Sequence, residues 1–138
     1  MTIGFDSIKR SYGRCVLTRA AKEKFFHQFY ELFLNTHPDI TALFEHTDSD
    51  KQIVMLKNAI SMSILFAEKG DELAIDVLSK IRKSHSRERK DVKPEYYNYW
   101  LDSLIKTLWL CDPHFTPELE QDWRNLMQIS IDYIVEGY

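Results

Sequence analysis

The stretch that decides the fold is "FYELFLNTHPDITALF", residues 29–44, an apolar run that ends in a histidine–proline pair. Two rows of apolar residues at helical spacing run into it: Phe25, Phe29, Leu32 and Phe33, and beside them Phe26, Tyr30 and Leu34. A helix with two apolar rows packs between neighbours rather than on a surface. The His37-Pro38 pair ends this helix, because the residue before proline avoids helical backbone, and Pro38 suits the first position of a short helical turn.

The rest of the chain predicts further helices separated by short polar breaks. Aspartates in "EHTDSD", residues 45–50, suit the cap of a helix that stops near Gly70, and Asp71 opens the next. Pro94 starts another helix, Thr116-Pro117 starts the last, and a weaker segment covers residues 6–16. The apolar stripes of the four later helices are Ile53, Leu56, Ile60, Ile64 and Ala67; Ala74, Leu78, Ile81 and His85; Tyr97, Leu101, Leu104 and Leu108; and Leu119, Trp123, Leu126, Ser130 and Ile134. No stretch alternates with the period of a strand, so we expect an all-α protein.

Composition narrows the class of protein. A chain of 138 residues suits one domain, which we expect to span residues 1–138. The net charge of −3 favours neither nucleic acid nor an anionic membrane as a partner, and no apolar run approaches membrane-spanning length. The N-terminus has no apolar signal segment, and Cys15 and Cys111 lack the CxxC spacing of zinc sites. We therefore expect a cytoplasmic protein with reduced thiols.

His85 is the candidate functional residue. It continues the stripe of Leu78 and Ile81, so it should face inward at the end of its helix, just before the charged run "RERK". A core histidine bonded to a carbonyl, a general base and a metal ligand all fit that position. The stripe alone does not decide between these three roles.

Four blocks of the sequence, taken in order, resemble a known family. They are "FYELFLNTHPDITALF", "TDSDKQIVMLKNAI" (residues 47–60), "SHSR…VKPEYYNYWLDSL" (residues 84–104) and "ELEQDWRNLM" (residues 118–127). The chain resembles bacterial single-domain globins, and in particular the haem domains of flavohaemoglobins. Phe44 stands fourteen residues after Tyr30 as in those domains, and "KPEYY" is similar to the start of their G helix. The resemblance implies the globin fold, a three-over-three helical sandwich around haem.

The resemblance also implies a site. His85 matches the proximal ligand of haem b (iron protoporphyrin IX), with the Ile81 carbonyl or the Ser84 hydroxyl available to its second nitrogen. Tyr30 and Gln52 match the residues over the distal face of the iron, and Leu56 lies one turn along. The residues expected to contact haem are Phe44, Met55, Ile81, Ser84, His85, Val92, Tyr97 and Leu101. Three questions stay open: an internal bond for the Tyr30 hydroxyl, a surface position for Gln52, and His46, Lys51 or Tyr30 as a sixth ligand of the iron.

The chain departs from flavohaemoglobins on the proximal side. Between His85 and Lys93-Pro94 it is two residues longer, so the turn below the haem must differ. Those enzymes pair a tyrosine and a glutamate with the ligand histidine; Tyr97 matches the tyrosine, and the adjacent Tyr96 is the second candidate. The glutamate has no counterpart in register, and Glu136, two residues away, is the nearest candidate.

The expected function is reversible binding of oxygen, nitric oxide or carbon monoxide. The alternative within the fold is a nitric oxide dioxygenase, which would need a separate reductase because the chain has no flavin module and no GxGxxG. The basic segment from Arg82 to Lys90 is the candidate docking surface for that partner. Also compatible with the sequence are a globin-fold gas or redox sensor, an interaction module that has lost haem, and a helical domain unrelated to globins.

Overall fold

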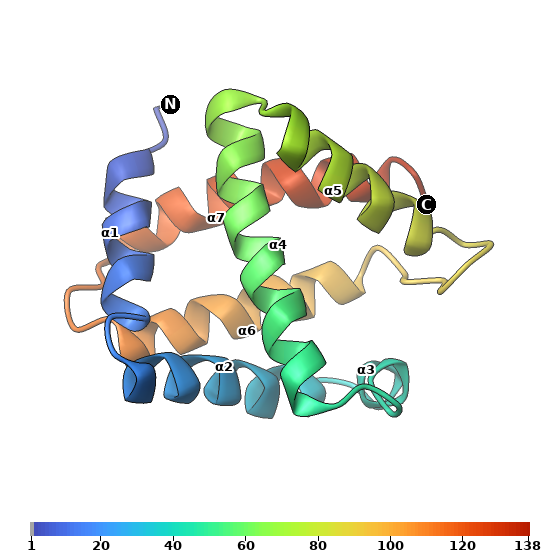
Figure 1. Cartoon of the computed structure of the whole chain (residues 1–138), viewed down its shortest axis with the longest axis horizontal. Helices are drawn as coiled ribbons and strands as arrows, with labels where there is room; N and C mark the ends of the chain where they lie inside the picture. The colour runs from blue at the N-terminus through green and yellow to red at the C-terminus, as the bar shows by residue number, and fades with distance from the viewer. Residues whose placement is uncertain (1) are drawn as a thin grey trace.

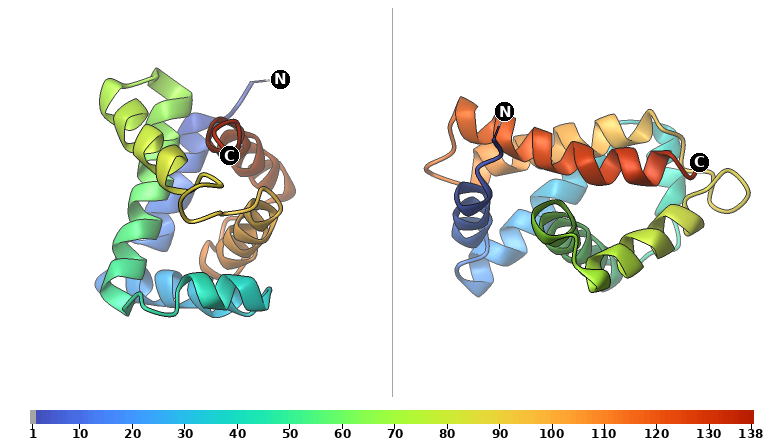
Figure 2. Two further views of the ribbon diagram at one scale, coloured as in Figure 1. Left: turned by 90° about the vertical axis from the view of Figure 1, so that its right-hand side faces the viewer. Right: turned by 90° about the horizontal axis from the view of Figure 1, so that it is seen from above.

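The computed structural model describes residues 2–138, and within them it contains helices and no strand. The helices are α1 (Phe5–Cys15), α2 (Arg19–Leu34), α3 (Pro38–Leu43), α4 (Ser49–Lys69), α5 (Glu72–Ser84), α6 (Tyr96–Cys111) and α7 (Pro117–Val135). The antiparallel helices α6 and α7 lie behind α4 and α5, and α2 runs along α6 (Figures 1 and 2). The prediction of an all-α protein is confirmed.

Most helix ends lie where the sequence predicts them. Thr18, Asp48, Asp71 and Thr116 each accept a hydrogen bond from a backbone N–H in the first turn of the helix that follows. Gly70 ends α4 in the left-handed region, with φ of 59°, where a side chain would be strained. These caps satisfy backbone groups that the helix itself leaves without partners.

Two helix boundaries differ from the prediction. Helix α2 ends at Leu34, and His37 caps α3 instead, because its Nδ1 accepts the Asp39 N–H at 3.0 Å. Helix α6 begins at Tyr96 rather than at Pro94, because the Tyr96 N–H donates to the Lys93 carbonyl three residues back, in a tight turn. Both differences amount to a few residues and leave the apolar stripes unchanged.

The core is built from the predicted stripes, and one corner of it is polar. Phe25, Phe29, Leu104 and Trp123 are fully buried between α2, α6 and α7. Beside them, the buried carboxylate of Asp112 accepts hydrogen bonds from Ser11, from Arg14 at 2.6 and 2.9 Å, and from the His114 N–H. Trp123 donates to Ser11, so the network joins α1, α6 and α7. No helix within residues 2–138 is long and apolar enough to cross a membrane.

Candidate functional site

His85 is the residue that directly follows α5, and its backbone N–H donates to the Ile81 carbonyl at 2.9 Å. Its ring is half-buried and reaches α6, where its Nδ1 lies 2.9 Å from the Tyr97 hydroxyl. Burial, aided by the positive charge of Lys90, lowers the pKa of His85 to about 4. The imidazole is therefore neutral at pH 7, the form that coordinates a metal.

The contact with Tyr97 corrects one expectation. The Ile81 carbonyl accepts from the Ser84 hydroxyl at 3.0 Å and from the His85 backbone, so neither Ile81 nor Ser84 is the partner of the ring. When Nδ1 carries the proton and donates it to the Tyr97 oxygen, the lone pair of Nε2 is left for a metal. No hydrogen bond within residues 2–138 engages Nε2.

The neighbouring tyrosine and the candidate glutamate lie elsewhere. Tyr96 donates to the carboxylate of Asp39 on α3, so it does not compete with Tyr97 for the histidine. Glu136 is exposed and lies 3.8 Å from Arg82 rather than beside Tyr97. Tyr97, which the resemblance matches to the family tyrosine and which continues the apolar stripe of Leu101 and Leu104, is the one of the two that contacts His85.

Tyr30, the residue expected over the distal face of the iron, projects from α2. It is buried, and its hydroxyl donates to the backbone carbonyl of Gln52 at 2.6 Å. Burial raises its pKa, so the phenol stays protonated and remains a donor. The Gln52 side chain, in the first turn of α4, points its amide toward the Thr47 carbonyl at 3.5 Å. The internal bond considered for Tyr30 is thus present in this structure.

The other residues expected to contact haem differ in how deeply they are buried. Leu56 on α4 and Leu101 on α6 are buried, and Phe44 packs edge-on against Tyr30 and Phe33 with ring centroids 5.8 Å apart in each pair. Ile81 and Val92 are half-buried against the core. Met55 is 41% exposed, although it is apolar and adjoins buried Leu56. All of these apolar side chains except Met55 belong to the hydrophobic core that contains Tyr30 or pack against it.

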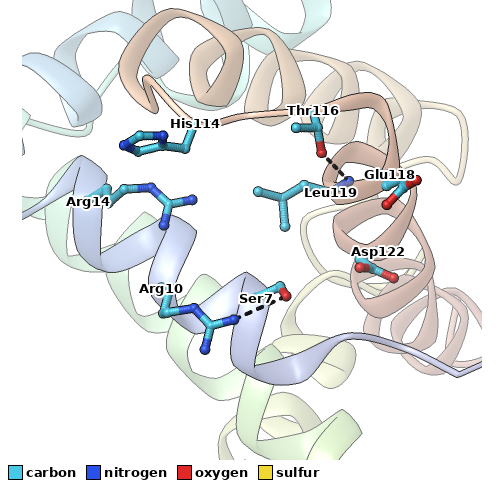
Figure 3. Close-up of a pocket in the computed structure, with 8 residues that line it drawn as sticks. All are labelled: Ser7, Arg10, Arg14, His114, Thr116, Glu118, Leu119 and Asp122. Atoms are coloured by element: carbon cyan, nitrogen blue, oxygen red, sulfur yellow. Dashed lines mark hydrogen bonds between the residues drawn. The ribbon is translucent and has the colours of Figure 1, made fainter.

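A surface pocket at the other end of the molecule contains none of the expected residues. It has a volume of about 230 Å³ and lies between α1 and the start of α7. Figure 3 shows the basic groups of Arg10, Arg14 and His114 on one side and the carboxylates of Glu118 and Asp122 on the other. Because Arg14 is already bound to Asp112 and the opposite charges offset one another, the pocket favours no class of ligand.

Comparison with known proteins identifies the family. The family model described as Globin matches residues 27–134. The solved structure of PA3967 from Pseudomonas aeruginosa PAO1, described as structurally highly homologous to a human haemoglobin, is similar to this chain with 32% identity. That match has a TM-score of 0.87 and covers 97% of both chains. No curated protein matches the chain. The globin fold expected from the sequence is confirmed, and the chain belongs to the globin family as a bacterial-type single-domain globin, which implies a haem cofactor.

Proposed function

We propose that this protein is one globin domain over residues 1–138, that it holds haem b through Nε2 of His85, and that it reversibly binds oxygen or a related diatomic gas. The observation that supports this most directly is the 2.9 Å contact between His85 Nδ1 and the Tyr97 hydroxyl. With the proton on Nδ1, this contact holds the ring in one orientation and leaves Nε2 for the metal, which is what a metal-binding histidine requires. When haem is present, its iron supplies the centre at which the gas binds.

The other residues suit the same group. Leu56, Leu101, Phe44, Ile81 and Val92 supply the apolar surface that a porphyrin needs and exclude water from the gas. Met55, exposed at 41%, is in our proposal covered by the porphyrin.

Tyr30 is the donor proposed for the bound gas. It exchanges its bond to the Gln52 carbonyl for one to the ligand. Gln52 itself, and Ser84 behind His85, complete the set of residues that we assign to the site.

The test is the absorption spectrum of the ferric, ferrous and carbon monoxide forms of purified protein. We expect histidine-ligated haem b in wild type, loss of that spectrum in His85→Gly, and its return on addition of imidazole. His27→Gly is the matched control, because His27 is an exposed histidine on α2. A histidine-type spectrum that survives in His85→Gly would refute the assignment.

A second function is favoured by one surface. Residues 82–90 carry five lysines or arginines and one acidic residue, in a chain whose net charge is −3. Lys83, Arg87, Arg89 and Lys90 are exposed and lie close in sequence to His85. We infer that an acidic reductase docks on this basic segment, so that the protein works as a nitric oxide dioxygenase in the cytoplasm. Nitrate should exceed one equivalent per haem only when a reductase and its nicotinamide are supplied; nitrate that never exceeds one equivalent would refute this function.

A further inference from the structure

The end of α7 contacts residues that precede His85 in the sequence and residues that follow it. We call Tyr133, Glu136, Gly137 and Tyr138 the α7 clasp. Figures 1 and 2 show the end of α7 beside the end of α5 and the loop that follows it. The residues of the clasp are far from His85 along the chain, so these contacts come from the tertiary fold alone.

After His85, the clasp holds the loop through Tyr138. The Tyr138 carbonyl accepts the backbone N–H of Arg87 at 3.1 Å, and the Arg87 guanidinium lies 4.8 Å from the centroid of the Tyr138 ring. The Tyr138 hydroxyl donates to the carboxylate of Asp91. One residue thus binds the loop through its backbone, its ring and its hydroxyl.

Before His85, the clasp holds the last turn of α5 through Arg82. The Arg82 guanidinium lies 4.9 Å from the centroid of the Tyr133 ring and 3.8 Å from the Glu136 carboxylate. A Cβ added at Gly137 would lie 2.4 Å from the Arg82 side chain, so the arginine would have to shift to make room for it. The side chains of Arg82 and Glu136 are 33% and 70% exposed, so close packing of the arginine matters more here than the ion pair.

The loop in turn is bonded to the residues around His85. The Val92 N–H donates to the His85 carbonyl at 3.1 Å, and the Lys90 N–H donates to the Ser84 carbonyl at 3.1 Å. Asp91, the acceptor of the Tyr138 hydroxyl, has φ of 51°, a left-handed conformation that aspartate tolerates better than most residues. A loop that relaxed at Asp91 would therefore release the carbonyls of both Ser84 and His85.

We propose that Tyr138 is a positioning residue for His85: through Arg87 and Asp91 it fixes the loop of residues 86–92 and thereby the orientation of the imidazole. His85 needs such support because α5 ends just before it, so no further helical turn follows to hold its backbone. Its side chain makes a single hydrogen bond among the described residues, to Tyr97. The proposal rests on the proposed function, in which His85 is the axial ligand of haem.

The test uses three variants of the full-length protein. Tyr138→Phe removes the bond to Asp91 and keeps the ring beneath Arg87. Asp91→Asn keeps an acceptor oxygen and a residue that tolerates positive φ, so it should behave like wild type. Tyr12→Phe is the matched control, because it also removes one tyrosine hydroxyl, but on α1 at the opposite end of the molecule.

Two measurements report on the clasp. In the haem-bound ferrous protein, resonance Raman measures the iron–histidine stretching band; in the haem-free protein, amide exchange measures protection of Arg87 and Val92. We expect Tyr138→Phe to shift and broaden the band and to speed exchange of both amides about threefold to tenfold, the effect of one exposed hydrogen bond. Tyr12→Phe should leave both readouts at the wild-type values.

The outcomes separate this proposal from the proposed function. A wild-type band that is unchanged in Tyr138→Phe, or that changes equally in Tyr12→Phe, overturns the positioning role and leaves haem binding intact. Asp91→Asn that behaves like Tyr138→Phe shows that the bond requires the charged carboxylate, and it therefore also supports the role of the hydroxyl bond. Absence of any iron–histidine band in wild type overturns the proposed function and the positioning role with it.

Discussion

Replacing Tyr97 by phenylalanine tests the proximal side of the site at a single atom. The ring of Tyr97 is buried and should stay in place, so the variant loses only the hydroxyl that lies 2.9 Å from His85 Nδ1. The Nδ1 proton then has no partner among the described residues. We therefore expect weaker haem retention with little change in the fold.

The size of the effect follows from that one bond. Loss of a hydrogen bond costs about 0.5–1.5 kcal/mol net, and leaving a partly buried donor unsatisfied costs about 1–3 kcal/mol. A cost of about 1.4 kcal/mol is a factor of ten in an equilibrium constant. Residues that support a metal ligand typically change metal affinity by about 10- to 100-fold, so we expect haem loss to be about tenfold faster.

The assay follows transfer of haem to an excess of a haem-free acceptor globin. Tyr96→Phe is the matched control, since Tyr96 is the adjacent tyrosine on α6 and donates to Asp39 instead of to His85. Urea unfolding of the haem-free proteins removes any contribution from general stability. Haem loss from Tyr97→Phe that is no faster than from Tyr96→Phe would refute the reasoning.

Three further predictions address the gas, the polar corner and the helix ends. Tyr30→Phe should speed oxygen release about threefold to tenfold and affect carbon monoxide less, as flash photolysis would show; equal effects on both gases would mean that Tyr30 acts through packing. Asp112→Asn should lower the free energy of unfolding by about 2–4 kcal/mol at pH 7, against about 0.5 kcal/mol or less for exposed Asp76→Asn. Burial raises the pKa of Asp112, but its bonds to Arg14, Ser11 and the His114 N–H outweigh burial and lower it. This stabilisation is therefore present above about pH 4 and is lost on further acidification, so the variant and wild type should converge in acid melts. Gly70→Ala should destabilise by about 1 kcal/mol in thermal melts, because Gly70 has positive φ, whereas Gly13→Ala, in open space on α1, should stabilise slightly.

The helices and their ends could be predicted from the sequence because their causes are local. A cap such as Thr18 or Asp71 acts within one turn, and Gly70 is needed where the backbone itself is left-handed. Helix α6 begins two residues after the predicted start, because Pro94 suits either the first residue of a helix or the turn that precedes one. In the structure Pro94 lies in that turn, which the bond from the Tyr96 N–H to the Lys93 carbonyl closes.

The candidate site could be predicted less completely. The inward position of His85 follows from the stripe, but its pairing with Tyr97 is expected only through the resemblance to flavohaemoglobins. Neither the apolar stripe nor the resemblance to flavohaemoglobins indicates that Tyr138 contacts the loop after His85. The contacts of Tyr138 with Arg87 and Asp91 join distant parts of the chain. They follow no helical or strand periodicity, so no pattern in the sequence could indicate them.

The two tyrosine hydroxyls of the site should contribute by different amounts. Tyr30 already donates to the Gln52 carbonyl at 2.6 Å, so a bound gas gains only the difference between two hydrogen bonds. Tyr97 has no second partner among the described residues, so its hydroxyl supports His85 at no competing cost. We also expect Tyr30 to slow association of the gas, because its bond to the Gln52 carbonyl would have to break before it could donate to the bound gas. Oxygen should therefore associate faster with Tyr30→Phe as well as leave faster, and the net change in affinity should be smaller than either change in rate.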